Sequence, residues 1–506
     1  MGLFMKKNTV KQVAGFLIFV FLITALFCNL TWLFRGNGSE AREEIGGFKN
    51  QGKIDVVFYG ASNLLRYYQP LTAWKEKGFT SYNYAVLSGQ ADSMKDYIAE
   101  SRRTNEAALY VCDVRAFTMI EDEVQEGGTR NWTDSLPVFS ADRWRGLTSY
   151  LFSRDTENID VPSYYFDLLK YHTNYEALAD EAQWRSLDRR AVYNVDKGFE
   201  PTEGHIPFEK PEVSEERTEL SERQSAALEQ LLDYCDREKL PVLFICNPII
   251  MKEADCGILN TIGDRISERG YTFLNCNRIY DEIGLDFETD FGDVNHVNYP
   301  GSVKYTEYLA DYISSHYDLP DHRDDPAYEQ WNKDCEVFEA QQKEWENSAR
   351  TVIEEHLRSK ENWTEVRSSK DFTTWFSKVN SPDYSVLVLM TEIPEKLAVT
   401  NPFREMTEKY GIEPGKSSLA GAWSGEEELA VSYDEEPIQI FIGNDGGRGV
   451  PACYISAAEQ LIRIRTDNYF VPGQKNQILI YDNNYEMPVD RVFLDLTEEG
   501  TVIRRQ

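Results

Sequence analysis

Three polar residues in two distant segments have the types needed to activate a serine nucleophile. Ser62 follows a short apolar run and a Gly-Ala pair, so its hydroxyl is expected in a tight turn at the end of a strand. Asp293 stands three positions before His296, in the segment GDVNHVNYPG that leads into a helical pattern. A neutral imidazole can take the proton of a serine hydroxyl, and a carboxylate at the other ring nitrogen fixes its tautomer. Ser62, Asp293 and His296 therefore predict an activated serine nucleophile.

Gly89 is the expected source of a backbone N–H for the same reaction. It follows a second apolar run, in a loop before a helical pattern, and has no side chain to obstruct its N–H. Ester cleavage by a serine needs such donors aimed at the oxygen that becomes negative. Taken alone, each segment also has an ordinary explanation, because Ser62 would serve as a helix cap and Gly89 as a plain turn residue.

These residues require a sheet that brings their segments together. Short apolar runs alternate with helical patterns, which predicts an α/β domain over residues 54–320 with a parallel sheet covered on both faces. Ligands of such sheets lie at the carboxyl ends of the strands, and both Ser62 and Gly89 follow an expected strand. Strands are expected at residues 54–59, 82–87, 107–114 and 241–248, and helices at residues 93–101, 219–239 and 301–316.

An aromatic-rich insertion, residues 118–216, interrupts this alternation. It is too long for a simple connector, and long insertions at strand ends often shape a substrate cleft. Alternatively, its aromatic side chains form a small core of their own. These side chains are Trp132, Trp144, Phe152, Tyr164, Tyr165, Phe166, Tyr171 and Trp184.

Together these segments resemble the SGNH, or GDSL-like, hydrolase family, in which an early serine is followed by a late Asp-x-x-His. The resemblance covers residues 50 to 320 and implies a flavodoxin-like three-layer fold. It also implies that Ser62 is the nucleophile, His296 the general base and Asp293 the residue that orients the base. The N–H groups of Ser62 and Gly89 would then form part of the oxyanion hole.

The chain departs from the family at the third motif, where a Gly-x-Asn-Asp turn normally supplies an Asn side chain to the oxyanion hole. The corresponding strand end here reads VCDVR, residues 111–115. Arg115 is one candidate for the missing donor, and Asn247, at the end of the next apolar run, is the other. The sequence does not choose between them, and it leaves a structural role open for Asp113.

With this departure and its N-terminal segment, the chain is similar to the cell-envelope branch of the family. That branch includes the D-alanyl transfer protein of teichoic acids and the alginate acetyltransferases. The similarity implies a serine esterase or O-acyltransferase that acts on acetyl or D-alanyl esters of a cell-surface glycan. It further implies an acylated carrier as a substrate and a multispanning membrane O-acyltransferase as a partner. The alternative is a catalytically silent glycan-binding or scaffold protein.

The N-terminus predicts a single-pass membrane anchor, residues 1–35, followed by a linker, residues 36–53. Lysines precede residues 13–34, which carry no charged side chain and are long enough to cross a bilayer as a helix. Trp32 suits the outer interface, and the lysines place the N-terminus in the cytoplasm and the bulk of the chain outside. A cleaved signal peptide is the competing interpretation.

The C-terminal part is expected to form a helical connector and a second domain. Apolar residues at helical spacing over residues 326–363 predict an amphipathic helix docked on the catalytic domain, within a connector spanning residues 321–370. A smaller β-rich domain follows over residues 371–506, with turn signals that include residues 444–447. Its last strands are similar to the interleukin-like inducer type of β-domain, which implies glycan binding or docking, and a purely structural role is the alternative. Its strands are expected at residues 385–390, 438–442, 461–465, 477–481 and 491–495.

Composition restricts the partners. The formal net charge of −32 repels polyanions, so we expect no nucleic acid partner. No two of the eight cysteines have metal-ligand spacing, and no Gly-rich phosphate loop follows a strand, so neither a metal nor a nucleotide or flavin cofactor is expected. Disulfides stay open, because sequence alone does not give the pairing.

Overall fold

The computed structural model describes residues 7–35, 39–120, 123–188, 192–202, 204–433, 436–443, 452–465 and 467–505. The chain divides into two compact units, the first ending at Thr351 and the second beginning at Val352.

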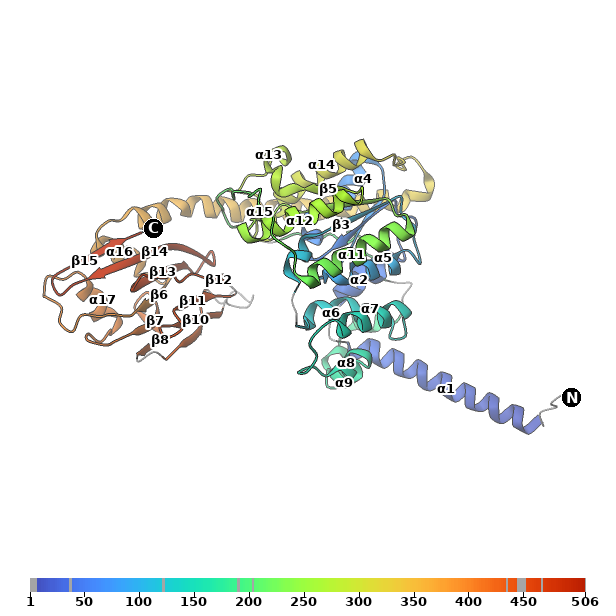
Figure 1. Cartoon of the computed structure of the whole chain (residues 1–506), viewed down its shortest axis with the longest axis horizontal. Helices are drawn as coiled ribbons and strands as arrows, with labels where there is room; N and C mark the ends of the chain where they lie inside the picture. The colour runs from blue at the N-terminus through green and yellow to red at the C-terminus, as the bar shows by residue number, and fades with distance from the viewer. Residues whose placement is uncertain are drawn as a thin grey trace. The chain divides into compact units, whose positions relative to one another are not determined.

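A five-stranded parallel sheet organises the first unit, with the strand order β2-β1-β3-β4-β5 (Figure 1). Every residue of β1 to β4 is buried, as expected for apolar runs in a sheet covered on both faces. The predicted α/β class and these four strands are confirmed, whereas β5 was missed because it is short and only partly buried. The strands are β1 (Val56–Gly60), β2 (Ser81–Ala85), β3 (Leu109–Asp113), β4 (Val242–Cys246) and β5 (Thr272–Asn275).

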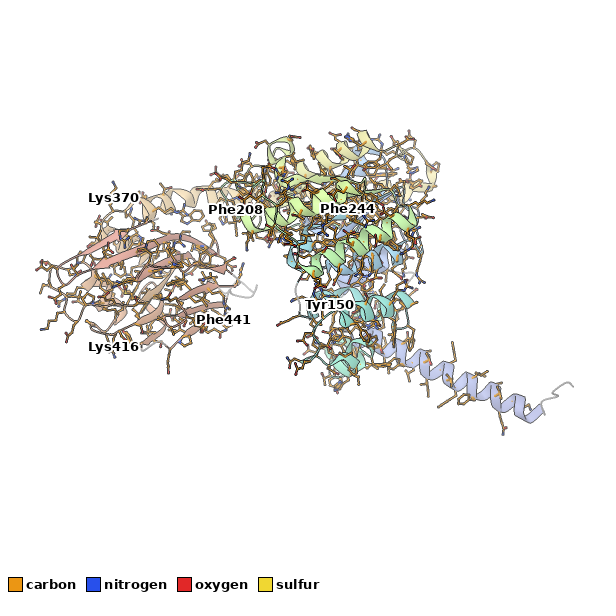
Figure 2. The ribbon with its side chains drawn as sticks, in the orientation of Figure 1. Tyr150, Phe208, Phe244, Lys370, Lys416 and Phe441 are labelled. Atoms are coloured by element: carbon orange, nitrogen blue, oxygen red, sulfur yellow. The ribbon has the colours of Figure 1, made fainter. Side chains whose placement is uncertain are left out.

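Helices form a layer on each side of this sheet. Figure 1 shows α4 and α14 on one side and α5 and α11 on the other, and Phe244 of β4 lies buried between the layers (Figure 2). Local sequence fixes the helix ends: Ser221 and Gln224 form a capping box on α11, and Asn298 caps α14. The helices are α3 (Ser62–Tyr67), α4 (Pro70–Lys77), α5 (Met94–Ser101), α11 (Glu222–Glu238), α12 (Glu253–Glu268) and α14 (Tyr299–His316).

The insertion is helical. Leu147, Tyr150, Leu151 and Tyr164 form a small core, so the interpretation of the aromatic residues as packing residues holds for part of them (Figure 2 labels Tyr150). Phe152, Phe166 and Trp184 are exposed instead. Its helices are α6 (Glu126–Thr133), α7 (Ala141–Phe152), α8 (Val161–Tyr165), α9 (Leu168–Tyr171) and α10 (Glu181–Arg185).

Helix α1 (Lys7–Phe34) is long and apolar enough to cross a membrane, by length and composition. Trp32 corrects the sequence-based prediction of an interfacial side chain: it is buried, and its Nε1 donates to Ser186 Oγ at 2.9 Å. Arg35 is buried as well, and its Nε donates to Asp167 Oδ2 at 2.8 Å. The C-terminal end of α1 is therefore packed into the insertion.

The segment expected to be a linker contains helix α2 (Ser39–Phe48). Ile45 and Phe48 of this helix are buried, and the Phe48 ring lies 5.2 Å from that of Tyr82 on β2. The sequence obscured this helix because its apolar face is short and lies among charged residues and two glycines.

Helix α15 (Glu329–Ser368) confirms the predicted amphipathic helix. Trp331 and Phe338 on its first half are buried in the core of the first unit, with the Trp331 ring 5.3 Å from that of Trp74. From Val352 onward the helix belongs to the second unit, where Trp363 Nε1 donates to Asp482 Oδ2 at 2.9 Å.

The second unit is β-rich, as predicted. Its two antiparallel sheets have the strand orders β15-β14-β13-β6-β7-β8 and β12-β11-β10-β9, and they share one core that includes Leu387, Ile455 and Leu479. The expected turn at residues 444–447 lies outside the described residues. Strands β7, β8, β10, β12 and β15 were not anticipated. The strands are β6 (Tyr384–Met390), β7 (Leu419–Ser424), β8 (Glu427–Tyr433), β9 (Ile438–Phe441), β10 (Ala452–Ser456), β11 (Leu461–Ile464), β12 (Asp467–Asn468), β13 (Asn476–Asp482), β14 (Met487–Leu496) and β15 (Thr501–Arg504).

Candidate active site

Ser62 stands in the turn that joins β1 to α3. Strand β1 ends at Gly60 and α3 begins at Ser62, so the serine lies at the carboxyl edge of the sheet. Ser62 is half-buried there. The turn is tight, because a Cβ on Gly60 would lie 3.2 Å from the Cβ atoms of Asp113 and Leu64. As the first residue of α3, Ser62 has an N–H with no acceptor inside that helix.

The loop before α14 positions Asp293 and His296 through a local turn. The N–H groups of Gly292 and Asp293 donate to the His296 carbonyl at 2.9 and 3.2 Å. In return, Asp293 Oδ1 accepts the N–H of Asn295 at 2.7 Å and of His296 at 3.0 Å. The Asp-x-x-His segment thus forms a hydrogen-bonded turn that holds the carboxylate beside the imidazole.

The two segments meet at hydrogen-bonding distance. His296 Nε2 lies 3.0 Å from Ser62 Oγ, and His296 Nδ1 lies 2.9 Å from Asp293 Oδ2. With the proton on Nδ1 facing the carboxylate, Nε2 can accept the proton of the serine hydroxyl. The His296 side chain is 20% exposed, so solvent and a substrate can reach the pair.

Asp293 has the charge state that this arrangement requires. Partial burial by itself would raise the pKa of its carboxyl group, but the bond to His296 and the backbone N–H donors outweigh burial and lower the pKa below its ordinary value. The carboxylate is therefore ionised at neutral pH and stabilises the tautomer with a proton on Nδ1.

Gly89 lies beside the serine turn, but its N–H is already engaged. A Cβ on Gly89 would lie 2.8 Å from the Gly60 carbonyl oxygen, so the loop after β2 packs directly on the turn after β1. The Gly89 N–H donates to the Val86 carbonyl at 3.1 Å across a turn in which Ser88 has φ 55°. In this conformation the Gly89 N–H is not available to an oxyanion, because it is bonded within its own turn. Gly89 instead allows the two loops to pack closely.

Asn247 does not face the serine either. It is buried below the site, where its Nδ2 donates to Asp113 Oδ2 at 3.2 Å and its Oδ1 accepts the hydroxyl of Tyr305. Asp113 also accepts from Asn63 Nδ2 at 2.8 Å and from the Arg115 N–H at 3.0 Å. Burial raises the pKa of Asp113 to about 6, although these donors partly offset it. Asp113 therefore ties together the ends of β1, β3 and β4.

The Arg115 guanidinium also contacts other residues. Its guanidinium donates to Thr118 in the same turn, and Nη2 lies 3.4 Å from Asp255 Oδ2 of α12. Neither candidate for the third donor is therefore aimed at the serine. The sequence could not decide this, because Asp255, Asp113 and Tyr305, which contact the two side chains, come from segments far along the chain.

Tyr67 is a site residue that no pattern in the sequence pointed to. It lies on α3 with Ser62, and its hydroxyl contacts the carbonyl oxygens of Pro248 and, at 3.1 Å, of Asn295. Burial raises the pKa of Tyr67 well above its ordinary value, so the hydroxyl keeps its proton and donates. Tyr67 thereby fixes the loop of His296 to the helix of Ser62.

The described residues contain no group of three or more His, Cys, Asp or Glu side chains placed to hold a metal ion, and all eight cysteines are free thiols. Compared with family models and with curated proteins, the chain has no match.

Proposed function

We propose that this chain is an SGNH-type serine hydrolase or O-acyltransferase. The observation that carries the proposal is the linked set Ser62 Oγ, His296 and Asp293, with contacts of 3.0 and 2.9 Å. The fold agrees with the resemblance, because the strand order 2-1-3-4-5 is the flavodoxin-like order. The three residues also lie where such a sheet presents ligands, outside the carboxyl ends of its strands.

The reaction proceeds through an acyl-serine. Ser62 Oγ attacks the ester carbonyl carbon while His296 Nε2 takes the hydroxyl proton, and the carbonyl π electrons move onto the oxygen. The N–H of Ser62, at the start of α3, is a donor to this oxyanion. The tetrahedral species then expels the alcohol, which receives the proton from His296. Water or a second hydroxyl then attacks the acyl-serine while His296 takes its proton. The second tetrahedral species breaks its bond to Ser62 Oγ, which recovers the proton from His296, and the acyl group departs on the new oxygen.

The proposed substrate is an acetyl or D-alanyl type ester on a cell-surface polysaccharide, or an acylated carrier that donates the acyl group. Helix α1 anchors the chain in the cell membrane by a single pass, with the N-terminus in the cytoplasm and the rest outside. A multispanning membrane O-acyltransferase is the proposed partner in this setting. A polymer that is not strongly anionic suits a chain of net charge −32.

A fluorophosphonate tests the nucleophile directly. We expect covalent modification of Ser62 in the full-length protein and none in Ser62→Ala, with folding of both checked by circular dichroism. Mass spectrometry of envelope polysaccharide from cells with and without the protein then identifies the ester that is gained or lost. A folded protein in which Ser62 stays unmodified would contradict the proposal.

A second candidate function is a catalytically silent glycan-binding or scaffold protein. The observation that favours it is that all three predicted accessory donors hydrogen-bond to other groups: Gly89, Arg115 and Asn247. Complementation distinguishes the two functions. A silent scaffold with Ser62→Ala restores envelope modification in a deletion strain, whereas an enzyme with this substitution does not.

A further inference from the structure

The apolar helix α1 is bare over only part of its length. Phe16, Phe21 and Leu26 are 65%, 70% and 60% exposed, whereas Trp32 and Leu33 are 5% and 3% exposed. The change occurs at Phe27, from which point the helix packs against the insertion. The turns from Phe27 to Phe34 therefore belong to the candidate membrane span and also pack against the protein.

The bare stretch is too short to cross a bilayer alone. Residues 13–26 cover about 21 Å at 1.5 Å per residue, whereas a hydrocarbon core of about 30 Å needs about 20 residues. The missing length, about 9 Å, corresponds to the next turns of α1, which the insertion already surrounds. If α1 crosses the membrane, parts of the insertion must enter the bilayer with it.

The insertion exposes apolar side chains where it surrounds α1. The ring of Phe139, which is 55% exposed, lies 6.3 Å from that of Phe27. The ring of Tyr175, which is 67% exposed, lies 6.3 Å from that of Phe34. Six such residues make up what we call the apolar collar: Phe139, Phe166, Leu169, Tyr175, Leu178 and Trp184.

We propose that the apolar collar lies in the outer interfacial layer of the membrane, in contact with lipid. Lipid is the occupant because the collar is continuous with the bare face of α1, and because that bare stretch is too short to hold the insertion clear of the bilayer. Trp and Tyr are the residues that prefer this layer. Charged neighbours such as Glu181 and Arg185, which pair with each other, are compatible with the headgroup level and not with the hydrocarbon core.

The collar binds by apolar insertion and not by attraction of its charge to lipid, since the chain carries a net charge of −32. The inference rests on the proposed membrane anchor and adds a second membrane contact to it. It does not depend on the acyl-transfer chemistry.

Spin labels on the full-length protein in lipid nanodiscs test the contact. Cys28 and Cys335, the two cysteines that are not fully buried, are replaced by alanine, and single cysteines are introduced as Leu169→Cys, Phe152→Cys and Leu22→Cys. Phe152 is the matched control, since it is 86% exposed and belongs to the same insertion, but its neighbour Ser153 contacts Arg223 of α11. Leu22, 59% exposed on α1, reports the anchor.

We expect the label at Leu169 to collide with molecular oxygen more often, and with a water-soluble nickel chelate at least about threefold less often, than the label at Phe152. Equal collision rates at Leu169 and Phe152, with Leu22 in lipid, would overturn the lipid contact of the collar and keep the anchor. The collar would then be left to contact a membrane protein. A label at Leu22 that meets the nickel chelate freely would overturn the anchor and the collar together. Fluorophosphonate labelling of Ser62 in the same samples tests the chemistry separately.

Discussion

Asp113 shows how one buried side chain can organise the neighbourhood of a nucleophile without touching it. Its carboxylate accepts from Asn63, Asn247 and the N–H of Arg115, which follow three different strands. Asn63 is the residue after Ser62, so the bond to Asp113 sets the direction in which the first turn of α3 leaves the sheet. A carboxylate with three donors and no solvent has both acceptor oxygens in use.

Replacing Asp113 by Asn should change how stability depends on pH. Burial raises the pKa of Asp113 to about 6 in the folded protein from an ordinary value of 3.8, so the folded state binds this proton more tightly than the unfolded state. The stabilising contribution is complete below pH 4 and is lost as the pH rises through 6. Asp113→Asn has no such proton, so its free energy of unfolding should decrease less between pH 4 and 7 than that of the unsubstituted protein.

Urea unfolding of both proteins at several pH values measures this difference. Other buried carboxyl groups with raised pKa values, such as Asp96 and Asp196, contribute equally to both proteins and cancel in the comparison. Identical pH profiles would show that Asp113 titrates as it does in the unfolded chain.

Gly89→Ala should lower the rate at which Ser62 reacts without unfolding the protein. The added methyl group would lie 2.8 Å from the Gly60 carbonyl oxygen and 3.4 Å from Ala61 Cα, so the backbone of the serine turn must move. A small displacement of a nucleophile lowers the rate about 10- to 100-fold, which fluorophosphonate labelling of Ser62 will measure. Gly127→Ala is the control, because a Cβ there meets no described atom within 4 Å. An unchanged labelling rate in Gly89→Ala would mean that the turn tolerates the shift.

Residue types and spacing predicted Ser62, Asp293 and His296 because Asp293 and His296 form a local turn and Ser62 directly follows a buried strand. They did not predict what Gly89, Arg115 and Asn247 do. The hydrogen bonds of Asn247 and the ion pair of Arg115 go to elements distant in sequence, and the hydrogen bond of Gly89 depends on a left-handed backbone angle at Ser88. Neither kind of information is present in a single sequence.

Among the elements, α3 has two tasks, since it begins with Ser62 and ends with Tyr67. The Tyr67 hydroxyl contacts the carbonyl oxygens of Pro248 and Asn295, so a six-residue helix connects the nucleophile to the loop of the base. A backbone hydrogen bond also holds the loop of His296, from the Ile250 N–H to the Val294 carbonyl at 3.0 Å.

Tyr67→Phe should therefore loosen the His296 loop. The substitution leaves buried carbonyl oxygens without their donor, at a cost of about 1–3 kcal/mol, and should reduce the labelling rate of Ser62. Tyr68→Phe is the matched control. Tyr68 is equally buried, but its hydroxyl accepts only a long 3.4 Å bond from Ser81, so we expect a loss below about 1 kcal/mol and normal labelling. Equal effects of the two substitutions would argue against a positioning role for Tyr67.

The elements that periodicity predicted best are those with one long apolar face. Helices α11, α14 and α15 and strands β1 to β4 were expected because their apolar residues repeat over several turns or run without interruption. Helix α2 and strand β5 were not, because Ile45 and Phe48 are few and β5 is only partly buried. Short elements acquire their structure from neighbours, and the sequence of the element alone does not contain those neighbours.

At the scale of the whole molecule, the two units have separate cores, and damage to one should spare the other. Trp375 of the second unit is fully buried on α16 (Phe372–Val379), and its Nε1 donates to Asp490 at 2.9 Å. Trp375→Ala should cost about 3–5 kcal/mol and lower one calorimetric transition, while fluorophosphonate labelling of Ser62 stays unchanged. Val399→Ala, at a residue 83% exposed, should change neither. Loss of labelling in Trp375→Ala would show that the serine depends on the second unit.

The way α1 ends has a mechanical consequence. Asp167 joins Arg35, the residue after α1, to Arg143 of α7 through bonds of 2.8 and 2.6 Å, and all three side chains are out of contact with water. Rotating α1 about its own axis would separate buried charges, which is strongly unfavourable. Helix α1 and the insertion consequently turn as one body. If α1 is the anchor that we propose, the insertion is held at the membrane surface, so the proposed acyl donor and polymer must be brought to the protein there.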